Sequence, residues 1–140
     1  MLRKMLRAGM FAALGMVSVV LAYGAGYAAD DKKDEKVPTI SEIMIKGHKG
    51  TDAYIARIRE AAKGEKWDDA KEYAKTLAVF GENLGKNKPP KGDAKSWENL
   101  TKKYAEATKA VLKATEDKDA KAVNKALGGI ACGECHKAHK

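Results

Sequence analysis

The residues most able to do chemistry stand together at the C-terminal end of the chain. Cys132, Cys135 and His136 form the pattern Cys-x-x-Cys-His, with two thiols three positions apart and an imidazole directly after the second. On a helix this spacing places both thiols on one face. There they could add to the vinyl groups of a haem as thioethers, while the imidazole binds the iron from the proximal side. The motif therefore predicts one covalently bound haem c, with Cys132 and Cys135 as its attachment points.

Two other uses of a Cys-x-x-Cys pair are a redox dithiol and half of a zinc site. A thioredoxin-like dithiol occurs beside a βαβ pattern, and a structural zinc site needs a second pair of ligands. Cys132 and Cys135 are the only cysteines of the chain, and no stretch shows the sustained alternation of a strand. The sequence therefore favours haem attachment over both alternatives.

Residues 1–28 have the pattern of a secretory signal peptide. Arg3, Lys4 and Arg7 precede an apolar run, and small residues gather before Ala28. This order predicts export and cleavage after Ala28, which would deliver the mature chain to a bacterial periplasm without a stable membrane span. An uncleaved anchor is the alternative, because the apolar run is marginally long enough to cross a membrane. Export agrees with the motif, since c-type haem is generally attached after translocation.

Positive charge dominates the chain of 140 residues, whose formal charge is +8 at neutral pH. Loss of the three basic residues of the signal peptide leaves +5. Most of this charge is lysine interleaved with acidic residues along predicted helices, which is typical of solvated helix faces. Nucleic-acid binding is not expected, because no basic cluster contains interleaved aromatic residues. We expect partner proteins with an acidic surface instead.

The mature chain divides into a charged leader and one domain. Residues 29–38 are rich in acidic and basic side chains and carry almost nothing to bury, which predicts a flexible segment. Residues 39–140 show the apolar periodicity of a single helical domain, which ends in the haem motif.

Four amphipathic helices are predicted in this domain. The first opens with a capping box at residues 39–42 and could bend or break where Gly47 and Gly50 lower its helix propensity. The second begins near Trp67 and ends in the proline- and glycine-rich stretch 85–92.

The third predicted helix opens near Asp93. The fourth follows a turn at residues 116–119, with Asp119 as its candidate cap, and leads directly into Cys132. Four such helices with short connections predict an all-α domain, an antiparallel up-down four-helix bundle with covalently attached haem near one end.

A Cys-x-x-Cys-His motif on the last helix of such a bundle resembles the cytochrome c-prime family, the class II c-type cytochromes. Residues 88–92 resemble the family's second crossover, and residues 127–132 resemble its run into the first haem cysteine. Three positions depart from the family pattern. Ile40 stands where arginine is frequent, and His139 and Lys140 stand where an aromatic residue and an arginine are frequent.

The opposite face of the iron has two candidate ligands on the first helix. The resemblance places Met44 at the family's distal position, where methionine gives six-coordinate iron and a non-ligand gives five-coordinate iron. His48 lies four residues further on and shares a helix face with Met44. With His136 in place only one of them can bind, so His48, Met44 and an open site are three alternatives. His139, on the helix of His136, cannot reach that face, and we expect it in solvent or near a haem propionate.

The function expected from these residues is electron transfer by one haem iron. The chain has no Ser-His-Asp set, paired-carboxylate site or phosphate-binding glycine loop, so an enzyme is not expected. The alternative is a five-coordinate protein similar to cytochrome c-prime that binds nitric oxide or carbon monoxide. The resemblance also implies a possible homodimer through the first two helices.

Overall fold

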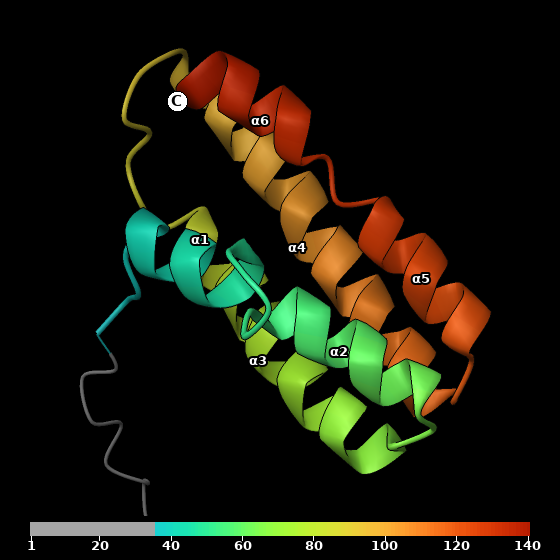
Figure 1. Cartoon of the computed structure of the whole chain (residues 1–140). Coiled ribbons are helices and arrows are strands. Elements are labelled where there is room, and N and C mark those ends of the chain that lie inside the picture. The colour runs from blue at the N-terminus through green and yellow to red at the C-terminus, as the bar shows by residue number, and fades with distance from the viewer. Residues whose placement is uncertain (1–35) are drawn as a thin grey trace, which may run out of the picture. The chain divides into compact units, whose positions relative to one another are not determined.

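The structure is a computed structural model that describes residues 36–140. The predicted signal peptide (1–28) and most of the predicted leader (29–38) lie outside the described residues. The described part contains helices and no strand, which confirms the all-α prediction for that part (Figure 1). Its six helices are α1 (Ile40–His48), α2 (Tyr54–Lys63), α3 (Trp67–Leu84), α4 (Ala94–Glu116), α5 (Ala120–Gly128) and α6 (Cys132–His139).

Local capping groups fix three of the helix starts, as the sequence predicts. The hydroxyl oxygen of Thr39 accepts from the backbone N–H of Glu42 at 3.2 Å, and the Glu42 carboxylate accepts from the Thr39 N–H at 2.8 Å. The carboxylates of Asp93 and Asp119 likewise accept from backbone N–H groups at the starts of α4 and α5. Each bond satisfies a backbone donor that has no partner inside the helix.

The first predicted helix is divided at its glycines into α1 and α2. Gly50 has a φ of +87°, which lies in the left-handed region that an L-amino acid adopts only with strain. The chain turns there and resumes a helix at Tyr54. His48 is therefore the last residue of α1, and Gly47 before it remains helical.

The fourth predicted helix is also divided, which the sequence analysis did not anticipate. It ends at Gly128, and α6 begins only at Cys132, so the prediction of a helix running directly into the motif is wrong. Gly128 and Gly129 have low helix propensity, and Ala131 has ψ +62°, outside the helical range. The Cys-x-x-Cys-His motif thus lies on a helix of its own.

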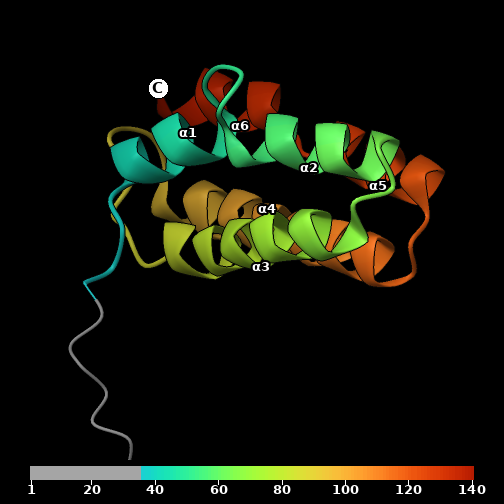
Figure 2. The ribbon, with the colours of Figure 1, turned by 60° about the horizontal axis from the view of Figure 1, so that its bottom comes forward.

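Figure 2 shows the helices in two layers, with α3 and α4 side by side in one and the shorter helices in the other. The two long helices approach each other closely at Gly81, where an added Cβ would overlap the Thr108 hydroxyl oxygen. In the second layer α1 and α2 contact α3, α5 and α6 contact α4, and α2 contacts α5.

Buried apolar side chains form two clusters. The larger one fills the space between α2, α3, α4 and α5. The smaller one joins α1, α3 and α4 through Ile43, Phe80, Leu84 and Trp97, and Cys135 packs against it. This second cluster connects the helix that carries the motif with the helix that carries its candidate partners. Within residues 36–140 no helix is long and apolar enough to cross a membrane.

Candidate cofactor site

A single cavity brings the five residues singled out from the sequence together. Its volume is ≈ 420 Å³, and Met44, His48, Cys132, Cys135 and His136 all contribute to its wall. The first two come from α1 and the other three from α6. Cavities of this size commonly bind cofactors and other small molecules.

The rest of the cavity wall comes mainly from α4 and from the segment that joins α5 to α6. It combines apolar side chains with a few polar ones: Leu84, Leu100, Lys103, Tyr104, Glu106, Ala107, Gly129, Ile130, Ala131 and Glu134. An apolar wall with few polar groups suits a large, mostly apolar ring.

The motif residues lie where a group in the cavity could reach them. Cys135 is half-buried, whereas Cys132 and His136 are exposed. Both thiols are free, so no disulfide joins them. The break at Gly129 turns α6 so that both thiols and the imidazole border one space.

Cys135 keeps its proton. Burial raises the pKa of its thiol, and the neighbouring Cys132 raises it further.

His48 is held from one side of its ring. Its Nε2 lies 2.7 Å from the hydroxyl oxygen of Tyr104, while Nδ1 is buried without a hydrogen-bond partner among the residues that the structure describes. Burial lowers the pKa of the imidazole, and the charge of His136 lowers it further. The ring is therefore neutral at neutral pH, which is the form that binds metals.

Met44 is half-buried one turn before His48 on the same side of α1, since both side chains border the cavity. It also packs against the smaller apolar cluster. A thioether in this place can serve either as an iron ligand or as a packing group. The structure therefore brings both distal candidates to the cavity and does not choose between them.

His139 does not lie in solvent, which was one of its two expected positions. Only 3% of it is exposed, so the expectation of a solvent-exposed side chain is wrong. Its Nδ1 lies 2.8 Å from the carbonyl oxygen of Lys91, and its Nε2 lies 3.2 Å from the Ser96 hydroxyl oxygen. The chain between α3 and α4 covers the end of α6 and buries this ring.

Tyr104 is the site residue whose role the sequence analysis missed. It could be read as an inward aromatic residue of the third helix, but nothing paired it with His48. The available signal was chemical, because a buried tyrosine hydroxyl usually finds a hydrogen-bond partner. Burial raises the pKa of Tyr104, and the nearby Cys132 thiol raises it further, so the phenol stays protonated.

The residues around the cavity fit a c-type haem. They supply two free thiols and an imidazole on one helix, which is the donor set that the attachment motif requires. Across the cavity they supply a thioether and a neutral imidazole, whose Nδ1 is covered and has no hydrogen-bond partner among the described residues. No group of three or more His, Cys, Asp or Glu side chains gathers to hold a bare metal ion within residues 36–140.

Comparisons with protein-family models, with curated proteins and with solved structures gave no match to this chain. Its function is therefore inferred from its own residues.

Proposed function

We propose that this chain is an exported monohaem c-type cytochrome that carries single electrons. The observation that supports this most is the cavity in which Cys132, Cys135 and His136 of α6 face Met44 and His48 of α1. In the sequence the two groups are more than eighty positions apart, so it is the fold that brings them to one cavity.

Each residue has a defined task in this proposal. Cys132 and Cys135 would hold the ring as thioethers, and His136 would bind the iron. A side chain of α1 would fill the remaining position and keep other molecules away from the metal. A bound haem would supply one-electron redox chemistry, and the protein would set its potential through the residues that bind the iron and through the burial of the ring.

We infer that the helices form the antiparallel up-down four-helix bundle of the cytochrome c-prime family. In this interpretation α1 with α2, and α5 with α6, each occupy one of the four helix positions. The contacts of these two pairs with α3 and α4, and the contact of α2 with α5, support it. The haem would then lie near one end of the bundle.

His48 is the sixth ligand that we favour, with Met44 as the alternative. A histidine that binds a metal usually gives its other ring nitrogen to a hydrogen-bond partner, which fixes the orientation of the ring. His48 has this arrangement, because Tyr104 holds one nitrogen and the other is unpaired.

A five-coordinate gas binder is the second candidate function. The observation in its favour is again the 2.7 Å contact between His48 Nε2 and Tyr104. If the metal lies on the Nε2 side of the ring, the phenol competes with it for that nitrogen. With Met44 as a packing group, the distal position is then open to nitric oxide or carbon monoxide.

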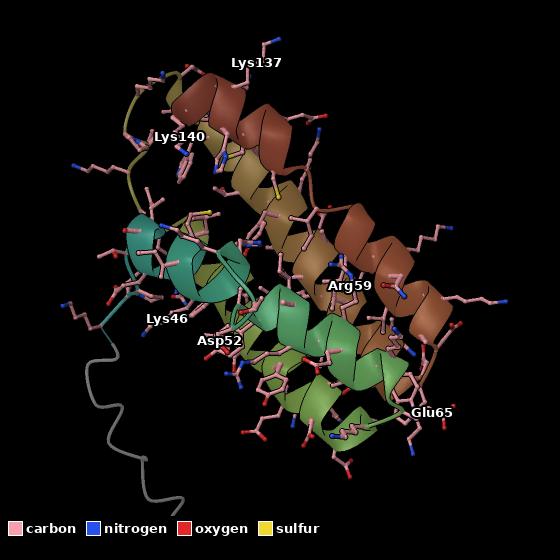
Figure 3. All side chains as sticks on the ribbon, in the orientation of Figure 1. Lys46, Asp52, Arg59, Glu65, Lys137 and Lys140 are labelled. Carbon is pink, nitrogen blue, oxygen red and sulfur yellow. The ribbon has the colours of Figure 1, made fainter. Side chains whose placement is uncertain are left out.

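We also propose a periplasmic location and partner proteins with an acidic surface. Support for such partners comes from exposed lysines on the motif helix and next to it. Figure 3 shows Lys137 and Lys140 at the C-terminal end of the molecule, and both are exposed. A homodimer would be compatible with this function.

The experiment that tests the proposal is expression in a bacterium that attaches haem to exported proteins. Wild-type protein should keep its haem on a denaturing gel and resist acid–acetone extraction. The double variant Cys132→Ala, Cys135→Ala should lose it. Wild-type protein that releases haem on extraction would overturn the proposal. If wild-type protein keeps its haem, a low-spin ferric spectrum would support the carrier. A high-spin ferric spectrum would support the gas binder.

A further inference from the structure

The segment that joins α3 to α4, residues 85–93, makes hydrogen bonds to Pro38, just before α1, and to α6. We refer to it as the crossover. The crossover contacts the chain at the start of α1 and the end of α6. It continues into α4, which carries Trp97.

The contact with α1 runs through Asn87. The side-chain amide of Asn87 donates to the backbone carbonyl of Pro38 at 3.1 Å, directly before the residue that caps α1. The backbone carbonyl of Asn87 accepts from the indole N–H of Trp97 at 2.8 Å. These two bonds connect the start of α1 to a side chain of α4 that is only 5% exposed.

The contact with α6 runs through His139. A carbonyl oxygen can only accept, so Nδ1 of His139 carries hydrogen and donates to Lys91, 2.8 Å away. In the neutral ring Nε2 then accepts from the Ser96 hydroxyl at 3.2 Å. The edge of the ring also meets Trp97, with 5.2 Å between ring centroids and an angle of 76°. Every polar atom of the His139 side chain is thus paired.

Gly92 allows this close contact. Its φ of +85° is in the left-handed region, and a Cβ there would lie 2.7 Å from the carbonyl oxygen of Ala138 and 2.8 Å from Nδ1 of His139. No side chain fits between the crossover and the end of α6.

The helix that carries the haem motif depends on these contacts for its position. Within α6, which the structure describes throughout, His139 is the one buried residue. A helix of eight residues has little stability of its own, so tertiary contacts must hold it in place.

We propose that His139 and Trp97 are positioning residues, which act through the crossover to set the separation of α6 from α1. This separation determines whether a side chain of α1 reaches the metal position opposite His136. An effective site requires its groups to be held within about 0.5 Å. The inference rests on the proposed function and deepens it, because it states how this chain keeps the sixth position filled.

The test compares holoprotein variants by optical spectrum and by carbon monoxide binding. In His139→Ala a high-spin ferric fraction should appear, and carbon monoxide should bind roughly tenfold faster, the lower end of the loss in metal affinity or activity seen when an outer-shell partner is removed. His139→Asn keeps a donor for Lys91 and should recover part of the loss. Trp97→Phe keeps an aromatic ring but loses the bond to Asn87, so it should show a smaller change of the same sign.

Val123→Ala is the matched control. Val123 is fully buried in the larger apolar cluster, far from the crossover contacts in the chain, so its truncation lowers the melting temperature without touching them. The control should keep the wild-type spectrum. The proposal would be overturned if the two variants lowered the melting temperature equally and also changed the spectrum equally. A wild-type spectrum in His139→Ala would overturn it as well.

Hydrogen exchange separates this inference from the proposed function, because it needs no sixth ligand. His139→Ala should accelerate amide exchange in α1 as well as in α6, since the two helices are coupled through Asn87. Acceleration confined to α6 would overturn the inference, while haem attachment and electron transfer could still hold. Loss of haem from wild-type protein would overturn the proposed function and leave the exchange result to decide the coupling.

Discussion

The Nε2 atom of His48 lies 2.7 Å from the hydroxyl oxygen of Tyr104, while Nδ1 of the same ring is buried and unpaired. This pair spans the cavity wall from α1 to α4. Tyr104 can act in two ways once a metal is present. It can orient the imidazole for binding through the other nitrogen, or it can compete with the metal for Nε2.

Tyr104→Phe distinguishes these two roles. If Tyr104 orients His48, loss of the hydroxyl weakens the sixth bond, and carbon monoxide should bind about 10-fold faster to the ferrous protein. We expect this outcome, because metal-binding histidines usually have such a partner. Slower carbon monoxide binding and a stronger low-spin spectrum would show that the phenol competes for the ring. Stopped-flow mixing measures the rate directly.

Much of the fold could be predicted because its signals are local. The caps at Thr39, Asp93 and Asp119 are read from a few neighbouring residues, and the structure confirms all three. Glycines also marked the break after α1. The break between Gly128 and Cys132 was missed, because the apolar period continues through Leu127 and Ile130 and conceals it.

The environment of the site could be predicted only in part. The motif was found from its residue pattern, and Met44 from the resemblance to the cytochrome c-prime family. His48 was found because it lies four positions from Met44 on the same helix face. The burial of His139 depends on the approach of Lys91 from a distant part of the chain. The Tyr104 contact joins residues 56 positions apart. Spacing within one helix says nothing about either contact.

Gly50 and Gly92 offer a matched pair for measuring the crossover contact. Both have positive φ, but a Cβ at Gly50 would meet nothing within 4 Å, whereas one at Gly92 would overlap Ala138 and His139. Gly50→Ala should lower the free energy of unfolding by about 1–2 kcal/mol, the cost of left-handed backbone. Gly92→Ala should cost more than Gly50→Ala. Denaturant titration of both holoproteins measures the difference, and equal losses would contradict the overlap.

If the cavity holds the proposed haem, its removal should loosen the packing of the protein. The cavity borders the smaller apolar cluster, and a bound ring would cover half-buried wall residues such as Met44 and Leu100, at roughly 25 cal/mol per Å² of apolar surface. We expect the apoprotein to keep its helical far-ultraviolet signal and to lose near-ultraviolet structure. A cooperative apoprotein transition as stable as that of the holoprotein would count against this expectation.

Substitution of the two distal candidates determines the sixth ligand. His48 and Met44 lie one turn apart on α1 and border the same cavity as His136. If His48 binds, His48→Ala should abolish the low-spin ferric spectrum and open the iron to carbon monoxide and nitric oxide. Met44→Leu should then leave the spectrum nearly unchanged and cost less than about 1.5 kcal/mol of stability, as volume-conserving swaps do.

If Met44 binds, Met44→Leu should abolish the low-spin ferric spectrum and His48→Ala should leave it nearly unchanged. Wild-type protein should then show the sulfur-to-iron charge-transfer band in the far red. A wild-type spectrum that is already high-spin excludes both ligands and favours the gas binder. The carrier is compatible with either ligand, because a filled sixth position keeps small molecules from the metal while electrons still pass. We expect the His48 outcome, since its ring is neutral, oriented by Tyr104 and left with one unpaired nitrogen.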